Sequence, residues 1–323
     1  MPRDVAVFGA AGYSGLELLK LLAVHPELRV ACAASDAQAG KPVGELTGRD
    51  HGSLAFVATA DAQRIARDCD AALLAVPPEA AKTLAAALAG KPKLVDLSHA
   101  HRATPSAAYG LVSLFEDDIA TAALVANPGC YATCVITAAA PLVAHGLVDG
   151  DLVASAGSGV TGAGRTSDEA MSLGEMYGEV RAYKVLRHQH VPEIQAALRR
   201  VSPSAPRVIL TTHLLPVARG IFVTLTARLA RQTPTDELVA HYRRLYANDP
   251  TVAIAPSAEH VSLRRVVGTN LCMVGIASDD RTVVVTAALD NLLKGAAGQA
   301  IENLNLVLGL PRMTGLMHLA RHA

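Results

Sequence analysis

Short apolar runs alternate with helical patterns over the first third of the chain, and this alternation constrains the fold more than any other feature of the sequence. Strands that are separated by helices form a parallel sheet with right-handed crossovers. Because helices cover both faces of such a sheet, its strands are apolar throughout, as the run AALLAV is. We therefore expect an α/β domain built on a parallel sheet. Its expected strands are residues 4–9, 29–35, 70–78 and 93–98, and its expected helices are residues 14–26 and 80–90.

The middle of the chain has longer strand patterns with fewer helices between them. Residues 207–229 predict two strands joined near Pro216 and Gly220, and residues 282–291 predict another strand. We therefore expect a second domain of the α+β class with a mixed sheet. A strong helical pattern follows at 295–310.

The segment GAAGYSG, residues 9–15, lies between the first expected strand and the first expected helix. Its G-x-x-G-x-x-G spacing is a variant of the dinucleotide-binding fingerprint. In this interpretation Gly9 and Gly12 let the backbone approach a pyrophosphate, Gly15 lets helix and strand pack closely, and N–H groups at the helix start hold the phosphates. An ordinary strand-to-helix turn is the alternative, but the position at the first βα junction favours a cofactor site. The residues predicted to bind the cofactor here are Gly9, Ala11, Gly12, Tyr13, Ser14 and Gly15.

The end of the second expected strand should face the adenosine ribose. Ser35 would bond a ribose hydroxyl or a 2′-phosphate. Asp36 favours a free 2′-OH and hence NAD, but it is equally well explained as a solvated loop carboxylate. Lys41 is the nearby cation. These residues leave the choice between NAD and NADP open.

The segment LVANPGCYATC, residues 124–134, predicts the start of a helix. Asn127 is a favourable N-cap and Pro128 suits the first helical position. We expect the helix to end near Pro141. Cys130 then falls in the first turn of this helix.

A cysteine in a first helical turn has the environment that a nucleophile needs. Unpaired N–H groups and the helix dipole stabilise a thiolate at Cys130 and could hold an oxyanion on an attacked carbonyl. Cys134 lies one turn further along and is expected to pack in the core. The cysteines are five and scattered, which is untypical of a disulfide framework, and no Cys/His spacing resembles a zinc site. We expect reduced thiols, no metal and a cytoplasmic protein.

A thiolate nucleophile needs an acid/base partner, and the segment around 182–198 offers His188 and His190. The run up to His188 has an extended pattern, and Pro192 marks a helix start. If the pair is extended, both imidazoles point to one side, where one of them orients the other or binds substrate. Structural histidines are common, but the combination with a thiol elsewhere favours a functional pair.

Arg102 follows the expected strand at 93–98. Ligands bind at the carboxyl ends of strands in such sheets, and a guanidinium there suits a phosphate or a carboxylate. An exposed loop arginine is the alternative interpretation.

Charge and composition exclude several classes of partner. Lys plus Arg (29) equals Asp plus Glu (29), and aromatic residues are 3% of the chain. A neutral chain with few aromatics has no basic patch or stacking platform for nucleic acid. No apolar run is long enough to span a bilayer, and the N-terminus has no secretory pattern. We therefore expect a small molecule as partner, with no nucleic acid and no membrane.

Several segments, in this order, resemble the N-acetyl-gamma-glutamyl-phosphate reductase family of arginine biosynthesis and, more distantly, aspartate-semialdehyde dehydrogenase. The similarity covers nearly the whole chain. The segments are GAAGYSG, DLS, ANPGCYAT, SGVTGAGR, RHQHVPEI, HLLPVARGI, GTNLC and DNLLKGAAGQAIENLN.

The resemblance implies a Rossmann-type domain of residues 1–129 with 292–323, and a catalytic and dimerisation domain of residues 130–291 with a mixed sheet. It implies Cys130 as the nucleophile and one histidine of the pair as the acid/base, for which we favour His188 over the substrate-binding His190. Family members use NADP and are dimers or tetramers, so we expect NADP, with NAD as the alternative, and a homodimer or homotetramer. The resemblance predicts further cofactor-binding residues at Ser158, Gly159, Gly162, Gly164, Asn291 and Lys294, and we expect Arg102 and Asn127 to bind the substrate.

The expected reaction is NADPH-dependent reduction of N-acetyl-gamma-glutamyl phosphate to N-acetylglutamate semialdehyde, with release of phosphate through a Cys130 thioester. Departures from the family pattern leave the acyl group open: SHAHR stands where the family has S-A-D-F-R, YGLVSL where it has Y-G-L-P-E-L, HQHVPE where it has H-R-H-T-P-E, and Ser35-Asp36 where it has Ser-Arg. An N-succinyl or a carrier-linked glutamyl or aminoadipyl phosphate is the alternative substrate. A non-catalytic dinucleotide-sensing protein is the alternative of another class, against which Cys130 and the histidine pair argue.

Overall fold

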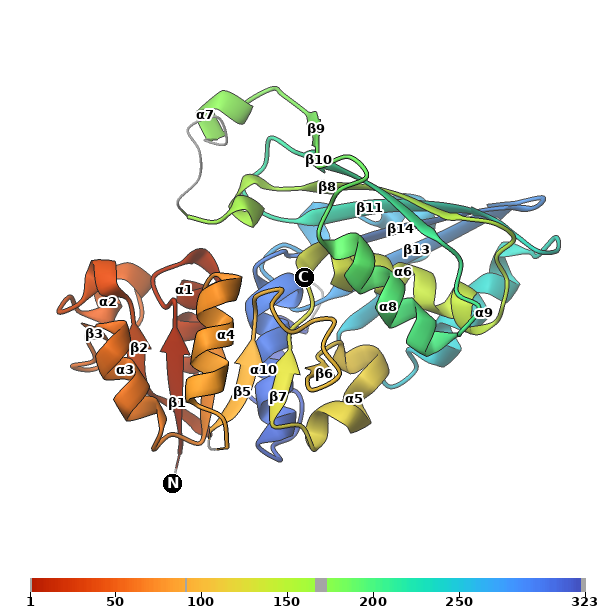
Figure 1. Cartoon of the computed structure of the whole chain (residues 1–323). Helices are drawn as coiled ribbons and strands as arrows, with labels where there is room; N and C mark the ends of the chain where they lie inside the picture. Colours follow the sequence, from red (N-terminus) through yellow and green to blue (C-terminus); the bar gives the residue numbers. More distant parts are fainter. Residues whose placement is uncertain (1, 91, 166–172, 321–323) are drawn as a thin grey trace. The chain divides into compact units, whose positions relative to one another are not determined.

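The computed structural model describes residues 2–90, 92–165 and 173–320 (Figure 1). The chain divides into two compact units: Met1–Gly129 with Ala296–His318, and Cys130–Gly295 with Leu319–Ala323. We refer to them as the first and the second unit. Each unit is built on its own sheet of seven strands.

The sheet of the first unit is parallel throughout. Its strands are β1 (Arg3–Phe8), β2 (Leu28–Ala34), β3 (Phe56–Val57), β4 (Ala71–Leu74), β5 (Lys93–Asp96), β6 (Ala108–Tyr109) and β7 (Leu124–Ala126). They lie in the order β3-β2-β1-β4-β5-β7-β6, with Val5 of β1 paired to Val30 on one side and to Ala71 on the other. The order reverses at β1, and ligands bind at such a switch point outside the carboxyl ends of the strands. The predicted Rossmann-type parallel sheet is confirmed.

Helices cover both faces of this sheet. Val5, Ala6, Val7 and Phe8 are consecutive in β1 and all are 0% exposed, although successive side chains of a strand point to opposite faces. Apolar strands of this kind need cover on both sides, which the amphipathic helices supply. The helices of this unit are α1 (Tyr13–Leu22), α2 (Val43–Thr47), α3 (Thr59–Ala66), α4 (Pro78–Ala87), α5 (Val112–Ala120) and α10 (Gly298–Val307).

The second unit has a mixed sheet, as predicted. Its strands are β8 (Leu152–Ser158), β9 (Arg181–Tyr183), β10 (Val208–Leu214), β11 (Ile221–Arg228), β12 (Val252–Ile254), β13 (Cys272–Asp279) and β14 (Thr282–Leu289). Their order is β12-β13-β14-β11-β8-β10-β9. The pairs β8–β10 and β12–β13 are parallel, and the other pairs are antiparallel.

One face of this sheet is covered by helices. The helices of this unit are α6 (Cys130–Ala144), α7 (Leu173–Met176), α8 (His190–Val201) and α9 (Thr235–Leu245), and α6, α8 and α9 cover this face. The helix α6 packs on β11 and β14, α8 packs on β10, and α9 packs on β13 (Figure 1). Burial alternates along β11, where Ile221, Val223 and Leu225 are fully buried and the residues between them are partly exposed. This period of two is typical of a sheet with one covered face.

The predicted end of a helix near Pro141 is wrong, because α6 continues through this proline. Proline has no N–H with which to bond the carbonyl of Thr137, four residues earlier. The hydroxyl of Tyr246 donates to that carbonyl at 2.8 Å, and the hydroxyl of Tyr242 donates to the carbonyl of Ala138. The hydroxyl of Tyr246 therefore replaces the missing helical bond and that of Tyr242 binds the next carbonyl, which the local sequence gives no means to foresee.

None of the helices in the described residues combines the length and the hydrophobicity that a membrane-spanning segment requires.

Candidate active site

Cys130 is the first residue of α6 and is half-buried, whereas the other four cysteines are buried. Its predicted place in a first helical turn is confirmed. The N–H groups of a first turn have no partner within the helix, so a thiolate there is stabilised by those groups and by the helix dipole. Cys130 is thus both reachable and in surroundings that favour its charged form.

The predicted N-cap at Asn127 is wrong, because α6 begins three residues later and the Asn127 side chain has other partners. Its Nδ2 donates to the carbonyl of Ala296 at 3.2 Å. Its Oδ1 accepts from Nδ2 of Asn303 in α10 at 2.9 Å. The side chain is buried and joins the end of β7 to the segment before α10 in the first unit. The side chain that would suit an N-cap instead forms hydrogen bonds with residues far away in the sequence.

Cys134 is fully buried, as predicted for a core residue. Burial raises the pKa of its thiol well above the ordinary value, and a hydrogen bond with Cys272 acts in the same direction. A thiol in such surroundings stays protonated and is a poor nucleophile. The two cysteines of the NPGCYATC segment therefore differ in exposure and in the state that their surroundings favour.

The rings of His188 and His190 lie next to each other, but the expected extended run before them reaches only to the end of β9 at Tyr183. Lys184 and Leu186 have positive φ angles of 49° and 58°, so the chain turns before His188, and α8 starts at His190. The two imidazole rings are 4.7 Å apart, and the ring of Tyr131, the residue after Cys130, lies 5.2 Å from that of His188. A tight turn, rather than a strand, brings both rings beside the start of α6.

His188 is held in its neutral form. Burial lowers its pKa from 6.5 to about 4, and the charge of Lys184 acts in the same direction. The backbone N–H of His190 donates to Nδ1 of His188 at 3.2 Å. Because Nδ1 accepts this bond, the single proton of the neutral ring is assigned to Nε2, which makes Nε2 a hydrogen-bond donor.

Two tyrosines complete the surroundings of the thiol, and sequence analysis missed both. The hydroxyl of Tyr183 donates to that of Tyr131 at 3.1 Å, and the hydroxyl of Tyr131 donates to the carbonyl of His213 at 3.2 Å. Burial raises the pKa of Tyr183 to about 12. Both hydroxyls are thus neutral, and each donates its proton to a group of the second unit. Their nearness to Cys130 and His188 in the sequence was the only available signal.

The loop after β8 folds closely against neighbouring loops of the second unit. A Cβ atom at Gly159 would lie 2.7 Å from the backbone nitrogen of Arg219, and one at Gly162 would lie 2.7 Å from Oγ of Ser158. Gly159 therefore requires glycine because its neighbour is backbone, whereas a side chain at Gly162 would require the hydroxyl of Ser158 to move. Asn291 donates from Nδ2 to Oγ1 of Thr161 in this loop at 3.0 Å. Ser158, Gly159, Gly162 and Asn291 lie together as one cluster, and their contact with a cofactor stays a prediction.

The loop of residues 9–15 in the first unit turns tightly between β1 and α1, and its binding of a phosphate stays a prediction. Gly9 has a φ of 70°, and a Cβ there would lie 2.1 Å from the carbonyl oxygen of Ala75 after β4. A Cβ at Gly15 would lie 2.3 Å from the oxygen of Gly9, so the predicted close packing of helix and strand is confirmed. At Gly12 the nearest atom to such a Cβ is that same oxygen, at 3.4 Å, and α1 starts after it with no side-chain cap. The residues Ala11, Tyr13 and Ser14 are half-buried in the same turn and first helical residues.

The residues after β2 have partners of their own. Both carboxylate oxygens of Asp36 accept from Thr59 at 2.8 Å, one from its backbone N–H and one from its hydroxyl. The backbone bond is the main cause that lowers the pKa of Asp36, and the hydroxyl bond adds to it. Ser35 is half-buried and Lys41 is exposed. Asp36 therefore stays charged while it anchors the start of α3.

Arg102 holds the loop after β5. Its Nε donates to the carbonyl of Asn127 at 2.8 Å and its Nη2 to the carbonyl of Leu97 at 2.9 Å. In the same loop Nδ1 of His101 lies 2.7 Å from the fully buried carboxylate of Asp96. The guanidinium thus orders the ends of β5 and β7 in the first unit, and its binding of substrate stays a prediction.

The comparisons with known proteins agree with this division of the chain. Residues 4–122 match the semialdehyde dehydrogenase NAD-binding domain, and residues 130–291 match the semialdehyde dehydrogenase dimerisation domain. An N-acetyl-gamma-glutamyl-phosphate reductase of Bacillus cereus (strain AH187) is 36% identical over 98% of this chain and 98% of its own. The chain belongs to the N-acetyl-gamma-glutamyl-phosphate reductase family.

Solved structures agree on the fold. Aspartate semialdehyde dehydrogenase II of Vibrio cholerae, complexed with ASA, superposes with a TM-score of 0.76 at 14% identity over 96% of this chain and 99% of that one. Aspartate semialdehyde dehydrogenase of Candida albicans, solved with NADP, superposes with a TM-score of 0.75 at 14% identity over 96% of this chain and 99% of that one. At such identities the likeness shows that this reductase-family chain has the semialdehyde dehydrogenase fold, and it shows no more than that.

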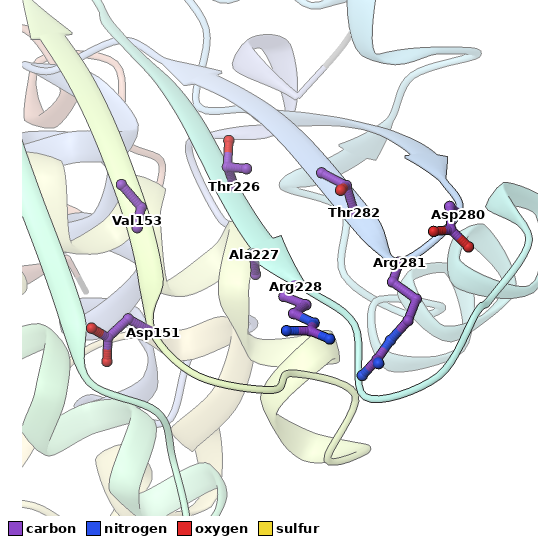
Figure 2. A pocket seen from close by; sticks show the side chains of 8 residues that line it. All are labelled: Asp151, Val153, Thr226, Ala227, Arg228, Asp280, Arg281 and Thr282. Atoms are coloured by element: carbon purple, nitrogen blue, oxygen red, sulfur yellow. The ribbon is translucent and has the colours of Figure 1, made fainter.

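A cavity of about 480 Å³ in the second unit of this reductase-family chain lies away from the predicted residues (Figure 2). It is at the start of β8 and the end of β11, whereas Ser158 is at the other end of β8. Seven residues of strand, at about 3.3 Å each, separate the two places by roughly 20 Å. Arg228 and Arg281 in its wall both lie near Asp149, at 3.6 and 3.1 Å. The cavity is lined by Asp151, Val153, Thr226, Ala227, Arg228, Asp280, Arg281 and Thr282.

Proposed function

We propose that this chain reduces N-acetyl-gamma-glutamyl phosphate to N-acetylglutamate semialdehyde and phosphate, with NADPH as reductant and Cys130 as nucleophile. The likeness to N-acetyl-gamma-glutamyl-phosphate reductase over nearly the whole chain supports the substrate. The observation that carries the chemistry is the half-buried Cys130 at the start of α6, beside a pair of buried histidines. A protein that only senses dinucleotides would need neither group.

The first step uses the thiol. The sulfur of Cys130 attacks the acyl carbon, the C–O bond to phosphate breaks, and the thiol proton leaves with the phosphate. The products are a Cys130 thioester and hydrogen phosphate. First-turn N–H groups of α6 stabilise the negative charge that develops on sulfur before attack and on the acyl oxygen during it.

The second step returns the thiol. The bound dinucleotide supplies a hydride to the thioester carbon. Nε2–H of neutral His188 donates to the acyl oxygen as it becomes anionic, which lowers the free energy of the tetrahedral thiohemiacetal. The C–S bond then breaks, the semialdehyde leaves, and Cys130 takes up one proton from solvent. A hydrogen-bond donor that remains neutral fits the lowered pKa of His188 better than a group that alternates between acid and base.

Residues of the first unit would hold the dinucleotide. The close approach at Gly9 and Gly15 and the uncapped start of α1 fit a pyrophosphate. NADPH is proposed as the preferred form on the family resemblance, while Asp36 favours NADH. The comparison of kcat/KM for NADPH and NADH decides this, and a clear advantage for NADH would overturn the preference.

The direct test runs the reaction backwards. Purified protein, N-acetylglutamate semialdehyde, inorganic phosphate and NADP⁺ should form NADPH, and omission of phosphate should abolish the rate. Parallel assays with N-succinylglutamate semialdehyde compare the acyl groups, and we expect the N-acetyl substrate to have the higher kcat/KM. No phosphate-dependent rate with either substrate and either cofactor would contradict the proposal.

We also propose that the working form is a homodimer or a homotetramer. The match of residues 130–291 to a dimerisation domain supports this, as does the partly exposed face of the second unit's sheet. Light scattering at micromolar concentration should give a multiple of the 33.5 kDa chain mass. A monomeric mass for the fully active protein would contradict it.

A further inference from the structure

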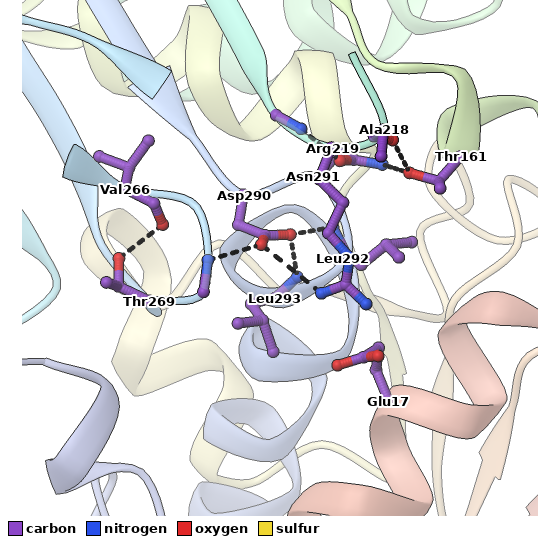
Figure 3. A network of polar contacts seen from close by, with 12 residues as sticks. Glu17, Thr161, Ala218, Arg219, Val266, Thr269, Asp290, Asn291, Leu292 and Leu293 are labelled. Atoms are coloured by element: carbon purple, nitrogen blue, oxygen red, sulfur yellow. Dashed lines mark hydrogen bonds and ion pairs between the residues drawn. The ribbon is translucent and has the colours of Figure 1, made fainter. Parts of the chain in front are cut away.

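A fully buried aspartate, Asp290, organises the chain after β14 (Figure 3). Its Oδ1 accepts from the backbone N–H groups of Leu292 and Leu293 at 2.8 and 3.1 Å. Its Oδ2 accepts from the N–H of Gly268 at 2.9 Å, and Nη1 of Arg219 lies 3.7 Å away. A buried carboxylate is costly unless its lone pairs are satisfied, and these bonds satisfy them.

The same residue closes the next turn with its backbone. The carbonyl of Asp290 accepts from the N–H of Gly295 at 2.9 Å, five residues later. This is the pattern of the short π-helix of Leu293–Ala297, which precedes α10. The helix expected over 295–310 therefore begins as a π-helix. Such turns are rare and are often found at functional sites, because they place one residue where a regular helix would not.

The residue placed in this way is Gly295, which lies directly against the nucleophile. A Cβ at Gly295 would be 2.8 Å from Cβ of Cys130 and 3.2 Å from its Cα. Real Cβ atoms essentially never approach so closely, so the cysteine would have to move if any side chain were present. The bare backbone of Gly295 thus forms a wall of the space in which the thiol can turn.

We propose that Asp290 is a positioning residue for Cys130, acting through the π-helical turn that sets Gly295 against it. The side chain of Asp290 holds the start of the turn, and its carbonyl holds the turn at Gly295. The thiol is thereby kept at the first turn of α6. The neighbouring Asn291 clamps a second segment by accepting from the N–H of Gly220 at 2.7 Å. The inference rests on the proposed function only in so far as Cys130 is the nucleophile.

The experiment measures the reactivity of Cys130 apart from turnover. Iodoacetamide labelling at Cys130 is followed by mass spectrometry across pH, together with kcat, KM and thermal stability. In Gly295→Ala the added methyl should push the thiol away from the helix start. We expect kcat to fall about 10²-fold, as displacements near 1 Å can cause, with KM changed less than about twofold. The midpoint of labelling should move to higher pH, because the thiolate loses the stabilising N–H groups.

A pair of variants tests Asp290 itself. Asp290→Ala removes every side-chain acceptor, and we expect kcat to fall at least about 10-fold with KM unchanged. Asp290→Asn keeps an oxygen for the N–H groups of Leu292 and Leu293 and should recover most of the loss. Recovery in Asp290→Asn would show that the hydrogen bonds of the turn are needed, whereas no recovery would show that the negative charge itself is needed.

Two matched controls isolate stability. Gly275→Ala would create a comparable clash, with a Cβ 2.5 Å from the carbonyl oxygen of Ser257, in the same unit but away from the thiol. Glu302→Gln replaces another fully buried carboxylate, which lies 2.7 Å from Nε of Arg312, by a neutral amide. Both should lower Tm and leave the labelling profile of Cys130 unchanged.

The outcomes are distinct. Wild-type kcat and labelling in folded Gly295→Ala, or equal kcat in Asp290→Ala and Asp290→Asn, would overturn the positioning role. A labelling shift that the controls share in proportion to Tm would also overturn it. If Cys130→Ser keeps its activity, the proposed function fails instead, while the labelling profiles still report whether Gly295 positions the thiol.

Discussion

Two helix starts, those of α1 in the first unit and α6 in the second, follow a strand in sequence, and the N–H groups of a first helical turn have no acceptor within the helix. The turn before α1 contains Gly9 and Gly12, and no side chain caps the helix. At α6 the first residue is Cys130, which has Gly295, Tyr131 and His188 near it. The start of α1 suits the phosphate of a ligand, and the start of α6 suits the thiolate of Cys130.

The difference shows how much each use of a helix start depends on its surroundings. A phosphate cradle needs only backbone groups and room, so a short run of glycines is enough to build it. A nucleophile needs a set direction and a nearby donor, which come from segments more than fifty residues away in sequence. Substitutions at the start of α6 should therefore affect the chemistry, and substitutions at the start of α1 should affect dinucleotide binding.

Removal of the thiol should have the largest effect. In Cys130→Ser the hydroxyl is not ionised near neutral pH, so we expect activity to fall by at least about 10⁴-fold with dinucleotide binding retained. Cys134→Ala, the matched control one turn further on, should lower the free energy of unfolding by about 1–2 kcal/mol and leave kcat nearly unchanged. Faster iodoacetamide labelling of Cys134 than of Cys130 would reverse the assignment.

Removal of the imidazole at His188 should come next. We expect His188→Ala to lower kcat by about 10²–10³-fold, since it loses a donor to the developing oxyanion. His188→Gln keeps an N–H near the position of Nε2 and should recover part of this. His190→Ala should mainly raise KM. A larger loss of kcat in His190→Ala than in His188→Ala would exchange the two roles.

The start of α1 is tested by Gly12→Ala. The methyl has room within the folded protein, at 3.4 Å from its nearest atom, but it would occupy space that a pyrophosphate needs. We expect KM for the dinucleotide to rise at least about 10-fold, with little change in Tm or in the labelling of Cys130. Gly15→Ala, in contrast, should lower Tm, because its methyl would meet backbone at 2.3 Å. Unchanged dinucleotide binding in Gly12→Ala would place the cofactor elsewhere.

A smaller effect is expected at Asp36. Its exposed carboxylate should repel a 2′-phosphate, so Asp36→Arg is predicted to raise kcat/KM for NADPH relative to NADH by about 10-fold. Asp36→Asn removes the charge and keeps an oxygen for Thr59, which separates repulsion from the loss of this contact. No change in cofactor preference in either variant would show that Asp36 acts only as an anchor for α3.

The smallest effect is a change in stability with pH. The pKa of His188 is near 6.5 in the unfolded chain and about 4 in the folded one. Between these values the unfolded chain binds the extra proton, so the stabilisation present above pH 6.5 is lost as the pH falls toward 4. The Tm of the wild type should fall more steeply over this range than that of His188→Gln. Parallel curves for the two proteins would show that His188 is not held neutral.

Local patterns in the sequence were sufficient for the parallel sheet, the mixed sheet and the place of Cys130 in a first helical turn. Each was predicted from a pattern within a short stretch of sequence, namely apolar runs, helical periodicity or the glycine spacing after β1. The need for glycine at Gly9 and Gly15 followed from the same logic and is confirmed. The burial of Cys134 followed from its apolar neighbours.

What only the tertiary structure decided is which polar groups meet. Asn127 has the side chain of an N-cap, but a buried amide bonds whatever partner the fold supplies, and here this is Asn303. Pro141 should end a helix, yet the hydroxyl of Tyr246 supplies the missing bond to the carbonyl of Thr137. Gly295 lies against Cys130 in a turn that the backbone carbonyl of Asp290 closes by accepting from the N–H of Gly295. The entropy cost of closing a loop grows only slowly with its length, so residues far apart in sequence can pair almost as readily as close ones. The local pattern of the sequence therefore does not indicate which distant polar groups will meet.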